Sequence, residues 1–335
     1  FKQKTAYEIY QCDWSSDVCS SDLQPRCIEC HTNNGRSKPL ALGAKLDTMS
    51  FLTANGDGSG PDPVYGHNVQ QHAQDAKAAA YDVPVQSFDT TVRTLPDGDK
   101  VELVKPVFAF KGPAPGRFSA RQAAQVIGMG LLEAVPESTI MGMADPNDAN
   151  GDGIRGVANL VVDPQTSKTH VGRFGWKASK GSIRQQVADA LIKDIGVTSP
   201  MFPDYGCQRG AANCHAVTTP TSISENELQR MTHYLSLIAV PAQRKLRSGF
   251  PDGIRVSPEH DVDPAKIARG SDLFTQVRCV ACHAPTLKTG ATHPFAELRE
   301  QTIHPYTDLL LHDMGPDLAD TLSRSEEHTS ELQSH

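Results

Sequence analysis

Two widely separated cysteine pairs, each followed directly by a histidine, are the residues of this chain best suited to chemistry. In the C-x-x-C-H spacing, the two thiols can bond covalently to the two vinyl groups of one haem, while the histidine coordinates the iron from the proximal side. The pairs lie much further apart than the roughly 15–20 residues of a zinc ribbon, and neither lies in the βαβ context of a thioredoxin-like redox pair. The sequence therefore predicts two haem c groups, attached through Cys27, Cys30 and His31 and through Cys279, Cys282 and His283.

The second axial ligand of each iron decides between electron transfer and catalysis. A strong ligand favours electron transfer, whereas an open or exchangeable position can bind peroxide. For the haem on His283 the preferred candidate is Met314, with His312 as its competitor and core packing as the other role open to this methionine. For the haem on His31 the candidates stay unassigned, and they are His67, His72, Met129, Met141 and Met143.

Four of the eight cysteines lie outside the two motifs. Cys207 and Cys214 flank a short stretch rich in Gly and Ala. Haem c is attached outside the cytoplasm, where disulfides form, so a local disulfide between these two residues is expected. A third, irregular haem site at Cys214 is disfavoured because its partner cysteine lies too far away in the sequence. Cys12 and Cys19 belong to the N-terminal segment discussed below.

The segment around residue 150 matches the first half of an EF-hand calcium loop. Asp148, Asn150 and Asp152 stand at positions 1, 3 and 5, and Gly153 stands at position 6. Position 12 is Asn159 rather than the bidentate glutamate. A calcium ion completed by other ligands and an Asx-rich turn without an ion both fit this pattern.

Trp176 is the only tryptophan outside the N-terminal segment. An aromatic side chain between two haems could relay electrons, which makes Trp176 a candidate relay residue. The alternative is a buried structural tryptophan whose indole N–H finds a hydrogen-bond acceptor.

The composition is that of a globular protein with a sizeable core. Of the 335 residues 38% are hydrophobic and 21% are charged, and the net charge is −7. An acidic chain does not suit nucleic acid or an anionic membrane as its main partner. No stretch approaches the roughly 18 apolar residues of a membrane-spanning helix.

Both ends of the chain look foreign to the rest. Residues 1–23 are polar and aperiodic, and they lack the basic and apolar regions of a signal peptide. They resemble a translated sequencing adapter, and residues 324–335 resemble its companion at the other end. We therefore expect residues 24–323, with a net charge of −3, to be a truncated part of a longer protein whose export signal is missing.

Regular elements are expected at four places between these ends. Residues 90–95 and 100–110 alternate around a Pro-Asp-Gly-Asp turn, which predicts a β-hairpin. Apolar stripes predict helices over residues 182–196, 224–240 and 264–277. Ser182 is the expected N-cap of the first helix, and Ser224 with Glu227 forms a capping box for the second.

Residues 24–323 resemble the bacterial di-haem oxidoreductases, a family that includes di-haem cytochrome c peroxidases and thiol oxidoreductases. Besides the two haem motifs, the resemblance rests on residues 128–133, 145–153, 173–178, 184–186 and 305–315. It implies a mainly α fold of two cytochrome-c-like haem domains with long loops and a small β-hairpin insertion. The expected domains are residues 24–243, with insertions, and a truncated second domain over residues 244–323.

The resemblance also implies a periplasmic or cell-envelope location. In the wider group of di-haem peroxidases, one haem relays electrons and the other reduces peroxide, often with calcium between the domains. The segment that follows residue 315 departs from the family pattern. The resemblance therefore implies an activity for the full-length protein, and it does not extend that activity to this chain.

Three functions fit these residues. The first is an enzyme, a di-haem c-type oxidoreductase of peroxidase type, in which electrons enter at the haem on His283 and reach the haem on His31, or the two haems have the reverse roles. The second is a di-haem cytochrome c electron carrier without a substrate, and the third is a thiol oxidoreductase that uses Cys207 and Cys214. The expected partners are a small electron-donor protein or a quinol-linked donor, together with a small oxidant such as peroxide. Neither nucleic acid nor a membrane span is expected.

Overall fold

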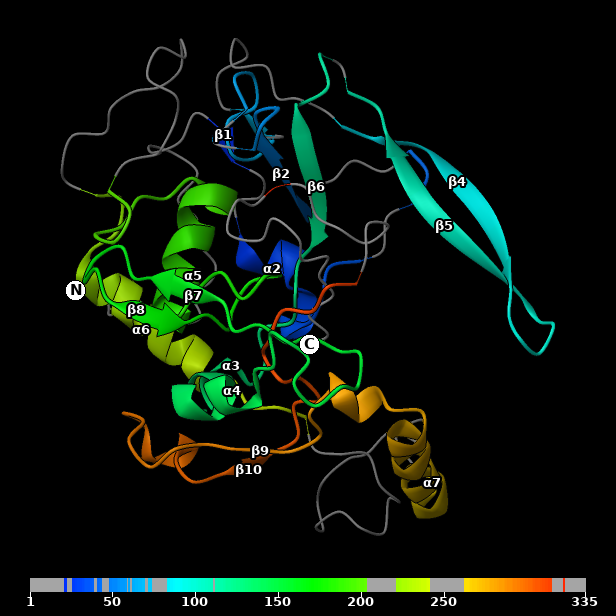
Figure 1. The fold of residues 1–335 in the computed structure, drawn as a ribbon. Coiled ribbons are helices and arrows are strands. Elements are labelled where there is room, and N and C mark those ends of the chain that lie inside the picture. The colour runs from blue at the N-terminus through cyan, green and yellow to red at the C-terminus, as the bar shows by residue number, and fades with distance from the viewer. Residues whose placement is uncertain are drawn as a thin grey trace.

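The computed structural model describes residues 21–22, 26–38, 41–43, 48–58, 60, 62–69, 72–73, 83–110, 112–203, 221–241, 262–314 and 322. The structure is 27% helical and 22% strand, and its strands form several small antiparallel sheets (Figure 1). The expectation of a mainly α fold made of cytochrome-c-like domains is therefore wrong. The main reason is that residues 49–54, 85–94, 100–108 and 117–122 pair as strands.

Each sheet in the described part of the chain is an antiparallel pair. The two largest pairs are β4 (Val85–Thr94) with β5 (Lys100–Phe108), and β2 (Met49–Ala54) with β6 (Arg117–Gln122). The short pairs are β1 (Ser21–Asp22) with β3 (His72–Ala73), β7 (Leu160–Val162) with β8 (Thr169–Val171), and β9 (Leu287–Lys288) with β10 (Thr302–Ile303).

An aromatic cluster explains why β2 and β6 form a sheet. Every second residue of β2 is buried from Met49 onward, which is the period of a half-buried strand. Phe51 is fully buried; its ring stacks on Phe118 with the centroids 5.1 Å apart and meets Phe108 and Phe110 edge-on at 5.3 and 5.6 Å. Such aromatic pairs stabilise beyond the area that they bury. Because these rings come from segments up to 67 positions apart, no local sequence pattern reveals the cluster.

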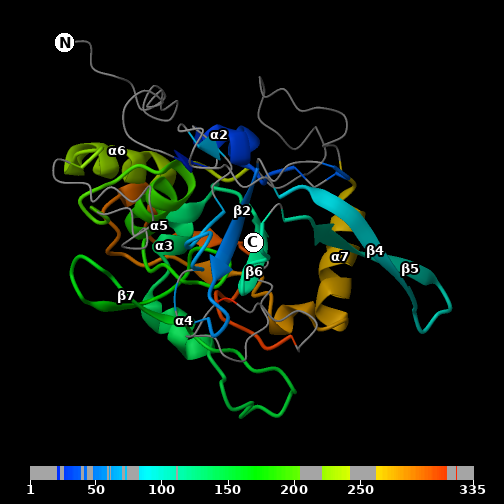
Figure 2. The same cartoon turned by 90° about the horizontal axis from the view of Figure 1, so that it is seen from above.

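The predicted hairpin is confirmed and is longer than expected. The pairing of β4 with β5 runs from Val85 opposite Phe108 to Thr94 opposite Lys100. The turn between the strands closes with the Leu95 N–H donating to the Asp99 carbonyl at 2.7 Å. Gly98 takes a φ of 92°, a left-handed conformation that suits glycine. This ribbon projects from the rest of the described molecule in both views (Figures 1 and 2).

The three predicted helices are present, with different ends. They are α5 (Ile183–Ala190), continued by the π-helical turn η2 (Leu191–Ile195), then α6 (Glu225–Ser236) and α7 (Pro264–Gln276). Helix α6 ends four residues earlier than expected. The shorter helices are α2 (Cys27–Cys30), η1 (Thr32–Asn34), α3 (Met129–Glu133), α4 (Glu137–Met143), η5 (Cys279–Ala281) and η6 (Ala296–Leu298). In the described residues no helix is both long and apolar enough to cross a membrane.

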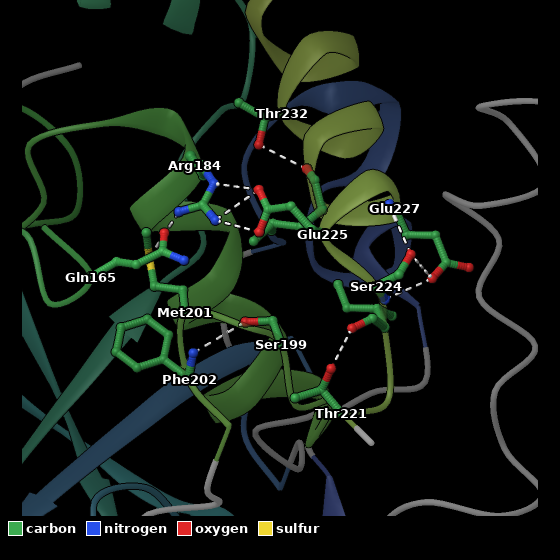
Figure 3. Close-up of polar contacts among 12 residues, drawn as sticks. Gln165, Arg184, Ser199, Met201, Phe202, Thr221, Ser224, Glu225, Glu227 and Thr232 are labelled. Atoms are coloured by element: carbon green, nitrogen blue, oxygen red, sulfur yellow. Dashed lines mark hydrogen bonds and ion pairs between the residues drawn. The ribbon is translucent and has the colours of Figure 1, made fainter. Parts of the chain in front are cut away.

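Helix capping fixes where α5 and α6 begin. The Ser182 hydroxyl accepts from the Gln185 N–H, and Ser224 and Glu227 form the predicted capping box (Figure 3). The two helices are then joined by Arg184, which donates to both carboxylate oxygens of Glu225 at 2.9 and 2.7 Å (Figure 3). A two-pronged arginine–carboxylate pair holds the relative orientation as well as the distance.

Three hydrophobic clusters hold the described residues together. One joins α3, α5 and α6, with Leu228 and Ile183 fully buried, and Cys27 packs against it. A second combines residues 131–171 with residues 284–310, so the segment that follows the second C-x-x-C-H motif packs against the middle of the chain. The third is the aromatic cluster on β2. The first cluster forms one wall of the site described next.

Candidate functional site

The first C-x-x-C-H motif is the single helical turn α2 followed by His31. Cys27 and Cys30 are both half-buried. Nδ1 of His31 lies 2.6 Å from the Ala124 carbonyl oxygen, to which it can donate. Such a bond leaves Nε2 as the nitrogen that can bind a metal. Burial lowers the pKa of His31, opposed by hydrogen bonds to the carbonyls of Ala124 and Gly35, and a neutral imidazole is the form that ligates metals.

These residues open into a cavity of about 460 Å³. Its volume lies within the roughly 300–1,000 Å³ of small-molecule and cofactor pockets. Cys27, Cys30 and His31 line it together with apolar and aromatic side chains of α3, α5, η2, α6 and the segment between β8 and α5, among them Met129, Leu132, Phe174, Trp176, Val187, Leu191, Met231 and Leu235. The motif thus faces a mostly apolar space large enough for a flat organic group.

Charged side chains line another part of the same cavity. Asp189 of α5 forms ion pairs with Lys180 at 3.4 Å and Lys193 at 2.7 Å, and Asp194 of η2 lies beside them. Lys177, which is 2% exposed, also lines the cavity. The lysines lower the pKa of Asp189 against the effect of its burial, so this carboxylate stays ionised. No sequence motif marks these charged residues, so no local signal separates them from surface charges.

The structure narrows the candidates for the second axial ligand at the first motif. His67 and Met129 line the cavity, whereas Met141 is 47% exposed and Met143 packs against the second hydrophobic cluster. Burial and Lys193 lower the pKa of His67. Met231, which the sequence did not single out, lines the cavity too. His72 lies in β3, but its side chain is outside the described part of the structure.

The second motif repeats the arrangement of the first. Cys279 begins the turn η5, and Nδ1 of His283 lies 3.0 Å from the Tyr306 carbonyl oxygen. Phe274, five residues before the motif, meets the ring of Tyr306 edge-on at 5.3 Å and lies 6.0 Å from the ring of His283. Both motif histidines thus direct Nδ1 at a backbone carbonyl, which is the usual way in which a protein orients a ligating imidazole.

His312 is engaged in other contacts. Its Nδ1 lies 2.8 Å from the Arg155 carbonyl, and its Nε2 lies 2.8 Å from the Asp308 carboxylate. The hydrogen bond to Asp308 is the main cause that raises the pKa of His312, with burial opposing it. An imidazole with both nitrogens hydrogen-bonded has no lone pair to offer iron. Met314 is 47% exposed, so its thioether remains accessible.

The predicted calcium loop lies against the second motif. Asp152 forms an ion pair with Arg278 at 3.2 Å, next to Cys279. Within the loop, Asp148 accepts from the Gly153 N–H, and Asn150 accepts from the Asp152 N–H. Burial, with the charges of Asp308 and Asp152, raises the pKa of Cys282. The loop thus contains Asx turns, and among the described residues no group of three or more His, Cys, Asp or Glu side chains suited to a metal occurs. Calcium binding in this loop stays a prediction.

Two further predictions have different outcomes. The indole N–H of Trp176 donates to the Gln122 carbonyl at 2.7 Å while the ring lines the cavity, so the residue has the hydrogen-bond partner expected of a structural tryptophan. Its role as a relay stays a prediction. Cys207 and Cys214 lie outside the described residues, and the disulfide between them stays a prediction as well.

Comparison with protein families finds one match, to the model of the family "Di-haem oxidoreductase, putative peroxidase", over residues 115–333. The chain belongs to this family. The match includes the second C-x-x-C-H motif and the cavity walls formed by α3, α5 and α6. No curated protein and no solved structure matches the chain.

A di-haem oxidoreductase requires haem, and the cavity at His31 fits one. Its volume and apolar lining suit a porphyrin, and two thiols and a neutral imidazole stand at its edge. Haem also carries two propionate groups, and the cationic side chains of Arg26, Arg121, Lys177 and Arg230 line the same cavity. The donor set and the charge of the lining therefore agree with the cofactor that the family implies.

Proposed function

We propose that this chain is a di-haem c-type oxidoreductase that reduces peroxide at the site of Cys27, Cys30 and His31. The site of Cys279, Cys282 and His283 then relays electrons to it. The observation that carries this proposal is the 460 Å³ cavity, which opens at the first motif and holds both apolar walls and charged groups. A site that only transfers electrons needs no carboxyl groups such as those of Asp189 and Asp194 in the lining of its haem cavity.

The residues of the chain have separate tasks in this proposal. When bound, haem supplies an iron that can bind an oxidant and exchange electrons. His31 and His283 present Nε2 to the iron because the carbonyls of Ala124 and Tyr306 hold Nδ1. Met314 completes the electron-relay site, since His312 is held by Asp308 and Arg155.

The cysteines bind haem covalently in this proposal, each pair forming two thioether bonds. That chemistry implies maturation outside the cytoplasm, in the periplasm or cell envelope, and it is compatible with a disulfide between Cys207 and Cys214. A small electron-donor protein or a quinol-linked donor supplies the electrons. Trp176 lines the cavity and is the candidate relay between the two sites.

The test is spin-state spectroscopy together with peroxide turnover, on the full chain exported and expressed with haem c maturation. We expect one high-spin or exchangeable haem that binds cyanide, one low-spin haem, and consumption of peroxide that depends on a reduced donor. Met314→Ala should change the spectrum of the low-spin haem, whereas Met141→Ala, at an equally exposed methionine outside the cavity lining, should not.

Two results would exclude a peroxidase. Two six-coordinate low-spin haems without turnover would identify an electron carrier. Turnover of thiols that is lost when Cys207 and Cys214 are both replaced by Ser would identify a thiol oxidoreductase.

A further inference from the structure

Asp194 occupies an unusual piece of backbone at the cavity. Helix α5 does not continue as an α-helix but widens into the π-helical turn η2, which ends at Gly196 in the left-handed conformation. Single π-helical turns are rare and occur frequently at functional sites. Asp194 lies in this turn and lines the cavity that the first haem motif also lines. The widened turn thus places a carboxyl group in the lining of the cavity at which we propose that peroxide is reduced.

The partners of Asp194 differ from those of its neighbour Asp189. Asp189 takes both nearby lysines as ion-pair partners, Lys180 and Lys193. The hydrogen bonds that reach the carboxyl of Asp194 come from neutral groups, the Asn68 amide at 3.5 Å and the Ser50 hydroxyl. Two carboxyl groups in one cavity take different protonation states when lysines neutralise one of them and neutral donors hold the other.

The surroundings of Asp194 leave both its protonated and its ionised form populated near neutral pH. Burial is the main cause that raises the pKa of Asp194 to about 7, and the charge of Asp189 adds to it, while Lys193, Lys180 and the Ser50 hydrogen bond oppose. Other titratable or charged groups that line this cavity from neighbouring elements are His67 and Arg121. A group with such a pKa can both give and accept a proton at physiological pH.

We propose that Asp194 is the acid–base residue of this cavity, moving a proton between the two oxygens of a bound peroxide. The inference rests on the proposed function. Reduction of hydrogen peroxide breaks the O–O bond, consumes two electrons and two protons, and yields two molecules of water. The electrons come from the small electron donor, and solvent supplies the two protons. Asp194 takes the proton of one peroxide oxygen and delivers it to the other, which leaves as water, so the residue is unchanged at the end.

The experiment compares Asp194→Asn and Asp194→Glu with the parent protein, all as mature di-haem chains of equal haem content. The control is Asp97→Asn, because Asp97 lies exposed in the β4–β5 turn, away from the cavity lining. Two quantities are measured. One is the pH profile of peroxide turnover, and the other is the infrared carbonyl band of a protonated carboxyl group as a function of pH, which needs no turnover.

Asp194→Asn should lower kcat by roughly a hundredfold or more and remove an infrared band that titrates near neutral pH in the parent. Asp194→Glu should restore the band and part of the turnover, and Asp97→Asn should match the parent in both. Unchanged turnover in Asp194→Asn overturns the inference, as does a well-loaded Asp194→Glu protein that regains the band without turnover. If the parent itself consumes no peroxide, the proposed function fails, and this outcome is distinct because the infrared band is still present.

Discussion

Replacement of Asp194 by Asn should change how the stability of the protein depends on pH. The pKa of Asp194 is raised from 3.8 to about 7 in the folded protein, chiefly by burial. The folded state therefore binds this proton more tightly than the unfolded chain does. The resulting stabilisation is fully present below about pH 3.8 and is lost as the pH rises through about 7. The amide of Asn does not titrate, so the variant lacks this loss.

The magnitude follows from the separation of the two pKa values. A difference of about 3 units corresponds to about 4 kcal/mol over the whole pH range, and roughly 2.5 kcal/mol of it falls between pH 5 and pH 8. Asp189 does not contribute in this window, because its pKa is lowered and the carboxylate stays charged. Relative to the parent, Asp194→Asn should thus gain roughly 2.5 kcal/mol in unfolding free energy from pH 5 to pH 8.

Urea unfolding, followed by circular dichroism at several pH values, measures this difference. Asp97→Asn serves as the control, because it makes the same chemical change at an exposed turn and should parallel the parent. If Asp194→Asn also parallels the parent between pH 5 and pH 8, the carboxyl group is not held in a protonated state by the cavity. The assignment of Asp194 as a proton carrier would then lose its electrostatic basis.

Four further predictions concern the fold and the haem sites. Arg173→Leu should lower the unfolding free energy by about 3–5 kcal/mol in denaturant titrations, because the buried guanidinium donates to three backbone carbonyls at 2.7–3.0 Å; Arg173→Lys should fall in between. Gly130→Ala should cost at least about 1–3 kcal/mol, since its Cβ would clash with the Ser236 carbonyl oxygen of α6. Gly142→Ala in α4 has open space and should gain about 0.5–1 kcal/mol in the same titrations; a loss there would contradict the packing argument. Replacing both cysteines of one motif, as in Cys279→Ser with Cys282→Ser, should release that haem on denaturation, so mass spectrometry of the denatured protein should find one haem fewer than in the parent; an unchanged number of attached haems would argue against covalent attachment through these thiols.

Much of the local structure was predictable because its determinants lie within a few residues. Ser182 and Ser224 cap the helices at which the sequence places them, and the turn around Gly98 closes the predicted hairpin. The fold class was not predictable in this way. The strands that overturn the mainly α expectation are stabilised by Phe51 meeting Phe108 and Phe118, which are distant in the chain.

The sequence alone determined the chemistry that this protein can carry, because two C-x-x-C-H motifs need only five adjacent residues each. Only the tertiary structure decided what surrounds that chemistry. The carbonyl that orients His31 comes from Ala124, and the cavity is closed by segments more than 150 residues apart. The protonation of Asp194 depends in the same way on burial and on Asp189. Burial and electric fields are properties of the packed chain, so no spacing of residues in the sequence expresses them.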